Sequence, residues 1–422
     1  MPPTLEDIVR RRIQEKGPIP FAEFMEMALY HPAGGYYRRG KGRGARGDYF
    51  TSPQAHPAFG ALLAVQVYQV WEVLGRPSPF VVAEQGAGDG LLALAFMDFA
   101  ERLTASFAQA LRYVAIDLDT PPSPDWARQR GGQRLRSAAL PLRGVVGCLI
   151  ANEMVDAFPV HRWRVKGGSL EEAYVALRGD GLGEMWGPPS TPALEAWVRA
   201  LGIPLVEGTE GEACVRLPAW TRDLATALGQ GLAIIIDYGG MPAELYRTGR
   251  GGTVRAFRQH MATGDLYRHV GQQDITASVD FASLVRCARE AGLEVMGWVR
   301  QRVFLRNLGW DALRRALVAS RLPPAEAEAN RFGLQALVQE EGLGGYGVLL
   351  LGKGVPSFPV WGVDGLSPDG VTLVQGALAG GVPLLTPAHA PLLQGRYPHQ
   401  AVGAQALEVW TPSCTRQRGA VS

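Results

Sequence analysis

The feature that most constrains this sequence is a glycine-rich loop between an apolar run and a helical one. Residues 80–83 form a short apolar run that leads into EQGAGDG at residues 84–90, and residues 91–103 follow with helical periodicity. Glycines allow a sharp backbone turn and let a ligand approach the main chain closely. The pattern predicts a strand, a ligand-binding turn and a helix, which form the first unit of an α/β fold.

The same alternation of strand-like and helical segments continues along the chain. Strands are predicted at residues 80–83, 112–116, 147–151 and 232–236, with a final strand pair at 293–303 and 346–351. The second strand ends at Asp117, and the third leads into Asn152 and Glu153. Such alternation favours a mostly parallel sheet with helices on both faces, and open sheets of this kind bind ligands at the carboxyl ends of their strands. We therefore predict a Rossmann-like α/β fold with its site at that edge.

The other segments are expected to surround this core. The chain has 422 residues, which is more than one ordinary hydrophobic core needs, so we expect a large domain with an appended subdomain. The predicted parts are an N-terminal helical region and flap at 1–79, a core at 80–352 and an irregular C-terminal extension at 353–422. Within the core we expect a β-rich insertion at about 161–231 and a polar loop on the acceptor side at about 240–280.

Composition excludes several classes of protein. Hydrophobic residues make up 47% and charged residues 19%, as in globular proteins, and a net charge of +2 gives no general attraction to nucleic acid or an anionic membrane. The four cysteines are far apart, so we predict no metal site. We find neither an apolar run long enough to span a membrane nor a targeting segment, and therefore expect a cytoplasmic protein without nucleic-acid or membrane partners. The oligomeric state, a homodimer included, stays open.

The glycine spacing distinguishes two nucleotide-like cofactors. Sites for NAD use G-x-G-x-x-G and aim a helix N-terminus at a pyrophosphate. Here the spacing is G-x-G-x-G, and Glu84 precedes the first glycine. S-adenosylmethionine has no phosphate but carries a sulfonium and an ammonium, beside which a carboxylate is favourable. Asp117, at the end of the next strand, is placed to accept hydrogen bonds from ribose hydroxyls.

We therefore predict S-adenosylmethionine as the cofactor. The residues expected to contact it are Glu84, Gly86, Ala87, Gly88, Gly90 and Asp117. The alternative is a tight turn between strand and helix whose acids are simply solvated.

Five further motifs carry a more specific resemblance. They are GDYFTSP at 47–53, NEMVDAFPV at 152–160, DYG at 237–239, GTVRAFRQH at 252–260 and DITASVDF at 274–281. Together with residues 84–90 they resemble the MidA-like family of class I S-adenosylmethionine-dependent methyltransferases. This family includes the mitochondrial protein arginine methyltransferase that assists assembly of respiratory complex I. The resemblance runs from about residue 18 to 352.

The resemblance implies a class I methyltransferase fold, S-adenosylmethionine as cofactor and, as in the mitochondrial member, a protein arginine as methyl acceptor. A respiratory-complex subunit is one candidate partner. Three positions depart from the family pattern. The family usually has an acid where this chain has Gln54, Glu where it has Asp117, and His or Asn where it has Ser278. The exchange at Asp117 keeps the chemistry, whereas the other two leave acceptor specificity open.

Two carboxylates are the candidate catalytic residues. Methyl transfer is an in-line displacement, to which an enzyme contributes mainly alignment and electrostatic complementarity. Two acids can grip the planar fork of a guanidinium. Glu153 and Asp156 follow a strand end at the ligand-binding edge, with Asn152 as a polar neighbour. The alternative is that the two acids cap the following helix.

Two flanking segments supply further candidates. Asp48 and Thr51 belong to a segment that is expected to close over the cofactor as a flap, or else to form a structural turn. His260 and Asp274 lie in the 240–280 segment, where acceptor-binding residues are expected. An isolated loop histidine is more often a surface hydrogen-bonding residue.

Three hypotheses about function follow from these residues. The chain is a protein arginine methyltransferase, a methyltransferase for a small molecule or another nucleophile, or a catalytically silent assembly factor that binds S-adenosylmethionine. The intact loop at 84–90 argues against the silent factor, and the polar 240–280 segment favours a peptide-sized acceptor. The glycine spacing disfavours a nicotinamide enzyme.

Overall fold

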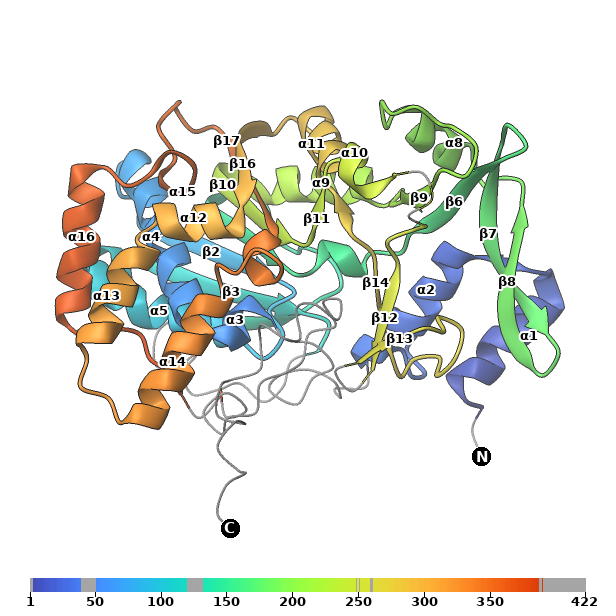
Figure 1. The fold of residues 1–422 in the computed structure, drawn as a ribbon. Coiled ribbons are helices and arrows are strands. Elements are labelled where there is room, and N and C mark those ends of the chain that lie inside the picture. Colours follow the sequence, from blue (N-terminus) through green and yellow to red (C-terminus); the bar gives the residue numbers. More distant parts are fainter. Residues whose placement is uncertain are drawn as a thin grey trace, which may run out of the picture.

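A seven-stranded sheet forms the centre of the molecule (Figure 1). The computed structural model describes residues 3–38, 51–119, 132–247, 249, 251–258, 261–386 and 389. The strand order is β16-β17-β10-β5-β2-β3-β4. In chain order the strands are β2 (Phe80–Gln85), β3 (Leu111–Asp117), β4 (Gln133–Arg136), β5 (Val145–Asn152), β10 (Leu228–Asp237), β16 (Glu294–Arg300) and β17 (Gly347–Lys353).

The order of these strands creates a switch point next to β2. Five neighbouring strands, from β4 to β10, pair in parallel, and β17 pairs antiparallel with both β10 and β16. The chain runs outward from β2 to β3 and β4, then returns to β5 on the other side of β2. Ligands of open α/β sheets bind at such a point, outside the carboxyl ends of the strands. The predicted Rossmann-like fold is confirmed.

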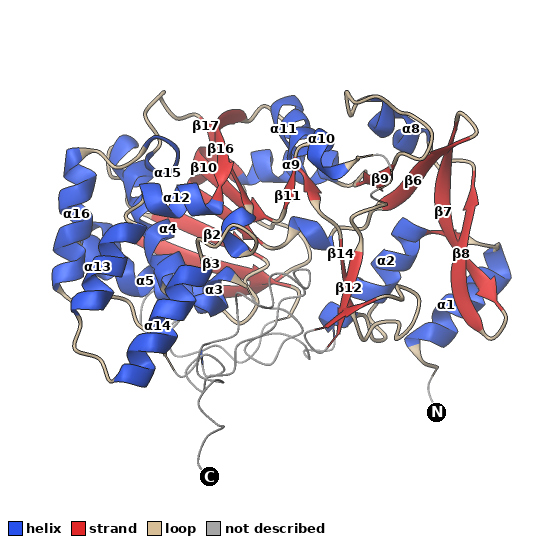
Figure 2. Cartoon of the chain, in the orientation of Figure 1, coloured by secondary structure: helices blue, strands red, loops and turns tan. Residues whose placement is uncertain are grey.

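Both faces of the sheet are covered by helices, as Figure 2 shows. Alternate residues of β10 enter two different cores, with Ile234 on one face and Ile235 on the other. Helices on the first face include α4 (Ala58–Val73), α5 (Leu91–Leu103) and α6 (Ala105–Ala110). Helices on the second face include α9 (Leu217–Ala227) and α11 (Phe281–Glu290). Burial on both faces explains why these strands are apolar throughout.

The insertion after β5 is built around a second, antiparallel sheet. Its strands are β6 (His161–Lys166), β7 (Ser169–Arg178), β8 (Gly181–Gly187) and β9 (Glu210–Ala213), joined by β1 (Ile19–Pro20), which pairs with β7. The helix α8 (Pro192–Arg199) lies between β8 and β9 in the chain. The β-rich insertion with a helix is therefore present as expected.

The segment before residue 80 divides between the two sheets. The helices α1 (Leu5–Lys16) and α2 (Phe21–Tyr30) lie beside β7 and β8 in Figure 1, and Phe24 belongs to the core of that side. The short helices η1 (Tyr36–Arg38) and α3 (Ser52–Ala55) follow, and α4 then packs on the main sheet through Phe59. The prediction of one N-terminal region misses this division, because the two-residue strand β1 leaves almost no local sequence signal.

The segment at 240–280 is more ordered than a polar loop. It holds β11 (Gly239–Gly240), α10 (Pro242–Leu245), β12 (Arg255–Arg258), β13 (Met261–Thr263), β14 (Asp274–Thr276) and β15 (Val279–Asp280). β12 pairs antiparallel with both β13 and β14. Ala256 and Ile275, opposite each other in this small sheet, are both buried. The expectation of a loop is wrong here because burial of these side chains stabilises short strands.

The C-terminal part is also more regular than the sequence predicts. The helices after β16 are α12 (Gln301–Asn307), α13 (Trp310–Ala319), α14 (Pro324–Ala336), η4 (Leu343–Gly345), α15 (Trp361–Asp364) and α16 (Pro368–Ala379). β16 ends at Arg300, three residues before the predicted end at 303. The expectation of an irregular extension is wrong for α15 and α16: the Ser367 side chain caps α16, and Val374 enters the main core. No helix in the described ranges is long and apolar enough to cross a membrane.

Candidate functional site

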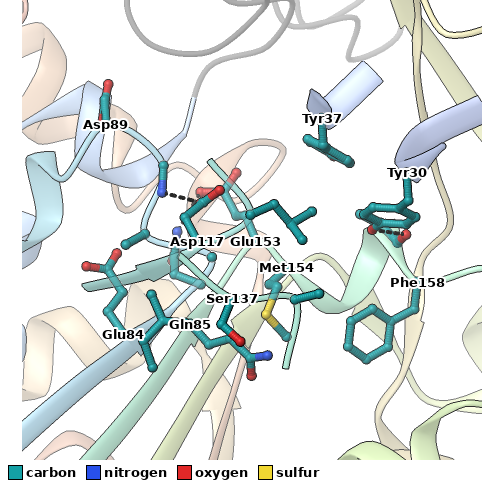
Figure 3. Close-up of a pocket in the computed structure, with 18 of the residues that line it drawn as sticks. Tyr30, Tyr37, Glu84, Gln85, Asp89, Asp117, Ser137, Glu153, Met154 and Phe158 are labelled. Atoms are coloured by element: carbon teal, nitrogen blue, oxygen red, sulfur yellow. Dashed lines mark hydrogen bonds between the residues drawn. The ribbon is translucent and has the colours of Figure 1, made fainter. Parts of the chain in front are cut away.

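A cavity of about 280 Å³ lies at the switch point of the main sheet. Residues at the carboxyl ends of β2, β3 and β5 line it, together with residues of the N-terminal segment and of the insertion. Figure 3 shows two ends, with Glu84, Asp89 and Asp117 at one and aromatic rings at the other. Glu153 and Met154 lie between the two ends.

The glycine loop exposes its backbone to this cavity. Gly86 and Gly88 have left-handed φ angles of +80° and +52°, and the N–H of Gly86 donates to the Ile116 carbonyl over 2.9 Å. A Cβ at Gly88 would meet no described atom within 4 Å, whereas one at Gly86 would lie 3.1 Å from the Met154 side chain. Gly88 therefore borders open space that a ligand can fill. Ala87 also lines the cavity.

Asp117 is fixed across this loop at the end of β3. Its Oδ2 accepts a hydrogen bond from the N–H of Gly88 over 2.8 Å, and its Oδ1 accepts one from the N–H of Asp119 over 3.2 Å. The carboxylate lines the cavity. An acid in this place beside a glycine loop accepts hydrogen bonds from a ribose.

Glu84 contributes a buried carboxyl to the same end. The Tyr113 hydroxyl donates to its Oε2 over 2.8 Å. Burial raises the pKa of Glu84 to about 8, against the lowering effect of Tyr113. A cationic group bound in the cavity would stabilise the carboxylate and lower this pKa. Glu84 thus suits the ammonium of S-adenosylmethionine, and Asp117 suits its ribose. The open space at Gly88 lets the cofactor approach the backbone closely.

Glu153, directly after β5, is a strained residue with a fixed carboxyl. Its φ of +49° is left-handed, which costs a non-glycine residue about 1–2 kcal/mol. Its Oε1 accepts hydrogen bonds from the N–H of Ser52 over 2.9 Å and from Asn152 Nδ2 over 3.2 Å. Burial raises the pKa of Glu153 to about 8, and the nearby Asp156 adds to the shift. Glu153 and Asn152 both line the cavity, and Asn152 acts by orienting the carboxyl.

Asp237, at the end of β10, holds the strained turn in place. Its Oδ2 accepts hydrogen bonds from the backbone N–H groups of Met154, Val155 and Asp156, at 3.2, 2.9 and 3.1 Å. The side chain is fully buried. Three donors on one carboxylate oxygen determine the path of the chain after Glu153. The motif DYG at 237–239 therefore fixes the backbone of the motif at 152–160.

The structure does not bring Asp156 into the cavity. Among the described residues its side chain does not line the cavity, and it is buried. Burial raises the pKa of Asp156 to about 7. The spacing of three residues would place both acids on one side of a regular turn, but the left-handed Glu153 interrupts that turn.

The capping alternative also fails for both acids. The short helix η3 (Val155–Ala157) has Met154 at its N-cap and no side-chain cap. Glu153 thus precedes the cap, and Asp156 lies inside the helix.

An aromatic wall forms the other end of the cavity. Tyr30 and Tyr37 stack with ring centroids 5.5 Å apart and planes at 27°, and Phe158 lies beside them in Figure 3. The Tyr30 hydroxyl donates to the Ala157 carbonyl over 2.7 Å, and the Tyr37 hydroxyl donates to Asp274 Oδ1 over 2.8 Å. These rings are not among the residues predicted from the sequence, although Phe158 lies in the motif at 152–160 and Tyr37 lies two residues after Gly35.

The remaining predicted residues have different positions. Asp274 is buried behind Tyr37 and, among the described residues, does not line the cavity. Thr51 lines it and is the N-cap of α3. Gly90 is not among the described residues that line the cavity. It is the N-cap of α5, with a φ of +85°. Asp48 and His260 lie outside the described residues.

Comparison with known proteins identifies the family of the chain. Residues 62–299 match a family of S-adenosyl-L-methionine-dependent methyltransferases. The chain belongs to this family. A protein from Burkholderia thailandensis, whose crystal structure was determined with bound S-adenosyl-homocysteine, is 29% identical, with a TM-score of 0.73 over 86% of this chain and 96% of that one.

Two curated relatives carry a more specific description. The mitochondrial protein arginine methyltransferase NDUFAF7 homolog of Drosophila melanogaster is 28% identical, with 80% of this chain and 82% of the relative covered. The mitochondrial protein arginine methyltransferase NDUFAF7 of Homo sapiens is 25% identical, with 79% of each chain covered. The MidA-like resemblance is confirmed, and the protein is an S-adenosylmethionine-dependent methyltransferase.

Proposed function

We propose that this methyltransferase modifies an arginine side chain of another protein. The observation that carries the proposal is the position of Glu153, between the cofactor end of the cavity and the aromatic wall of Tyr30, Tyr37 and Phe158. A carboxylate next to aromatic faces suits a planar, delocalised cation. The two curated relatives are named as protein arginine methyltransferases, which supports the same substrate class.

The protein's own groups have defined tasks in such a reaction. The bound cofactor supplies a methyl group on a positively charged sulfur. Ser52 and Asn152 hold Glu153 Oε1, and Oε2 makes no hydrogen bond within the described part of the chain, so Oε2 is directed to the acceptor guanidinium. A pKa of about 8 is close to neutral pH, which suits Oε2 to accept the proton that the acceptor nitrogen loses.

The aromatic wall has the task of orienting the acceptor. Tyr30 and Tyr37 are fixed by their hydroxyl hydrogen bonds to Ala157 and Asp274, so their rings have little freedom. A fixed aromatic wall restricts the guanidinium plane, and alignment of the attacking nitrogen is the main contribution an enzyme makes to a displacement. The same wall excludes water from the carboxylate of Glu153, which strengthens its attraction to a cation.

The test is methyl transfer from labelled S-adenosylmethionine to proteins of the host lysate, followed by hydrolysis and analysis of the labelled amino acids. We expect the label in methylarginine, with mono- and dimethyl forms resolved by the same analysis. Label in small molecules alone would favour a small-molecule methyltransferase. Binding of the cofactor with no transfer to any fraction would favour a silent assembly factor.

A further inference from the structure

One arginine of the chain already lies against the aromatic wall. The guanidinium carbon of Arg216 is 5.3 Å from the ring centroid of Phe158, and its Nη1 is 3.5 Å from Glu26 Oε2. Arg216, Phe158 and Glu26 all line the cavity. The molecule itself therefore contains a guanidinium held by one aromatic face and one carboxylate at the acceptor end.

Phe158 is fixed independently of Arg216. Trp220 packs against Phe158 in a T-shaped contact with centroids 5.5 Å apart. The indole Nε1 of Trp220 donates to Gln85 Oε1 over 3.0 Å, and Gln85 also lines the cavity. The aromatic face on which Arg216 rests is thus part of a rigid wall and remains in place if Arg216 leaves.

The contacts that hold Arg216 are weak. The side chains of Arg216 and Glu26 are 46% and 51% exposed, and an ion pair in such a place contributes little to stability. A cation over an aromatic ring at an exposed site adds only a small attraction. Within the described residues the Arg216 side chain makes no hydrogen bond, so it is displaced easily.

We propose that Arg216 occupies a cation subsite on Phe158 and Glu26, along the path that the acceptor arginine takes to Glu153, so that the acceptor must displace it. The inference rests on the proposed function, because it assigns a guanidinium as the natural occupant. Arg216 then acts as an internal competitor. Its removal frees the aromatic face and one carboxylate and also removes a like charge that repels the incoming cation.

The test compares Arg216→Met with a matched control, Arg286→Met. Arg286 on α11 also lies over an aromatic ring, 5.2 Å from the Trp197 centroid, and pairs with Glu290 at 3.9 Å. Arg286 is not among the described residues that line the cavity. Methionine keeps an unbranched side chain of similar reach but has no charge. We expect Arg216→Met to lower the KM for an arginine-containing acceptor peptide about threefold to tenfold with little change in kcat, and Arg286→Met to leave both unchanged.

A second measurement is independent of turnover. Methylguanidinium chloride is titrated by calorimetry into wild type and both variants, each saturated with S-adenosyl-homocysteine. We expect Arg216→Met to bind methylguanidinium more tightly than wild type and Arg286→Met to bind it equally. A third variant, Arg216→Lys, keeps the charge without the planar fork and should fall between wild type and Arg216→Met. Tighter binding without methyl transfer to any arginine peptide would contradict the proposed function but support the displacement of Arg216.

Two outcomes would overturn the inference. Equal methylguanidinium binding by wild type and Arg216→Met would show that Arg216 does not occupy a cation site. A higher KM for the peptide in Arg216→Met, with the KM of Arg286→Met unchanged, would instead show that Arg216 binds an acidic group of the partner.

Discussion

The backbone N–H of Ser52 donates a hydrogen bond to the Glu153 carboxyl over 2.9 Å and thereby joins two segments 101 residues apart. The Ser52 hydroxyl in turn donates to Gln301 Oε1 over 3.2 Å, and Gln301 Nε2 donates to the Leu337 carbonyl over 3.0 Å. The Glu153 carboxyl is thus held by Ser52 of α3, and Ser52 is held in turn by Gln301 of α12. The position of this carboxyl therefore depends on distant parts of the fold as well as on the end of β5.

The first prediction concerns Glu153→Gln. The amide keeps the size of the side chain but loses the charge that pairs with a guanidinium. Breaking a desolvated pair costs several kcal/mol, of which the amide regains part through hydrogen bonding. We expect kcat/KM for an arginine peptide to fall about a hundredfold, or about 2.7 kcal/mol at 1.36 kcal/mol per tenfold. The affinity for S-adenosyl-homocysteine should change less than about threefold, since Glu153 lies beyond the glycine loop.

Asp156→Asn is the matched control for this substitution. Asp156 is three residues away and buried, and burial raises its pKa to about 7, but its side chain is not among the described residues that line the cavity. We expect this variant to keep transfer within a few fold of wild type. Equal loss in both variants would mean that the charge of the whole acidic cluster matters, rather than the position of Glu153.

The second prediction is the pH dependence of the reaction. Burial raises the pKa of Glu153 to about 8, so the free enzyme is mainly protonated there at neutral pH. Pairing with a cation requires the carboxylate, so kcat/KM should rise about tenfold per pH unit below pH 8 and level off above it. A pH profile of wild type and Glu153→Gln from about pH 6.5 to 9 checks this. A wild-type profile as flat as that of the variant would remove Glu153 from the rate-controlling ionisation.

The glycine-loop end of the cavity could be predicted from the sequence because its signals are local. Glycines at 86 and 88, an acid before them and Asp117 at the next strand end all follow from short patterns and strand periodicity. The parallel sheet then brings these strand ends together, with Asp117 2.8 Å from the Gly88 nitrogen. Local pattern and topology agree here, so the prediction needs no knowledge of distant contacts.

The aromatic end of the cavity could not be predicted, because it is assembled from distant segments. Tyr30 and Tyr37 reach the cavity only because β1 pairs with β7 and brings α2 to the second sheet. The left-handed φ of Glu153 separates Asp156 from the cavity, and no sequence pattern marks such a conformation in a non-glycine residue.

The third prediction links cofactor binding to stability through Glu84. Burial raises its pKa from the ordinary 4.5 to about 8, so between these pH values the folded protein holds a proton that the unfolded chain releases. The free energy of unfolding of the ligand-free protein therefore falls as pH rises through this window. Glu84→Gln removes the effect and should melt at a higher temperature than wild type at pH 8. The difference should vanish near pH 4.5.

The same variant should bind the cofactor more weakly, because the charge that attracts the ammonium is lost. Thermal melting across pH and calorimetry with S-adenosyl-homocysteine give the two readings on one sample. Glu195→Gln on the exposed face of α8 is the control and should change neither quantity. A Glu84→Gln variant that is less stable at pH 8 would show that the Tyr113 hydrogen bond outweighs the burial of the carboxylate.

The fourth prediction separates the ligand role of the glycine loop from its backbone strain. Gly88 and Gly75 have positive φ angles of +52° and +78°, and at both a Cβ would meet no described atom within 4 Å. Gly88→Val and Gly75→Val should therefore both lose stability through strain, by about 1–2 kcal/mol or more. Only Gly88→Val should lose binding of S-adenosyl-homocysteine, because its side chain fills the cavity. Normal binding by Gly88→Val in calorimetry would make the loop a structural turn alone.

The last prediction tests whether the C-terminal helices belong to the methyltransferase core. On α16, Val374 is 1% exposed and packs in the main core, whereas Val371 on the same helix is 41% exposed. Val374→Ala removes two buried methyl groups and should lower the free energy of unfolding by about 1–3 kcal/mol, and Val371→Ala should lower it by less than about 0.5 kcal/mol. Both substitutions change helix propensity by the same amount. The difference between the two variants in the free energy of unfolding, measured with urea, therefore reports the loss of packing at Val374. Because α16 contacts α5, the helix that the glycine loop begins, the loss at Val374 should also weaken cofactor binding as the temperature rises. Equal stability of the two variants would show that α16 is an appendage which the core does not need.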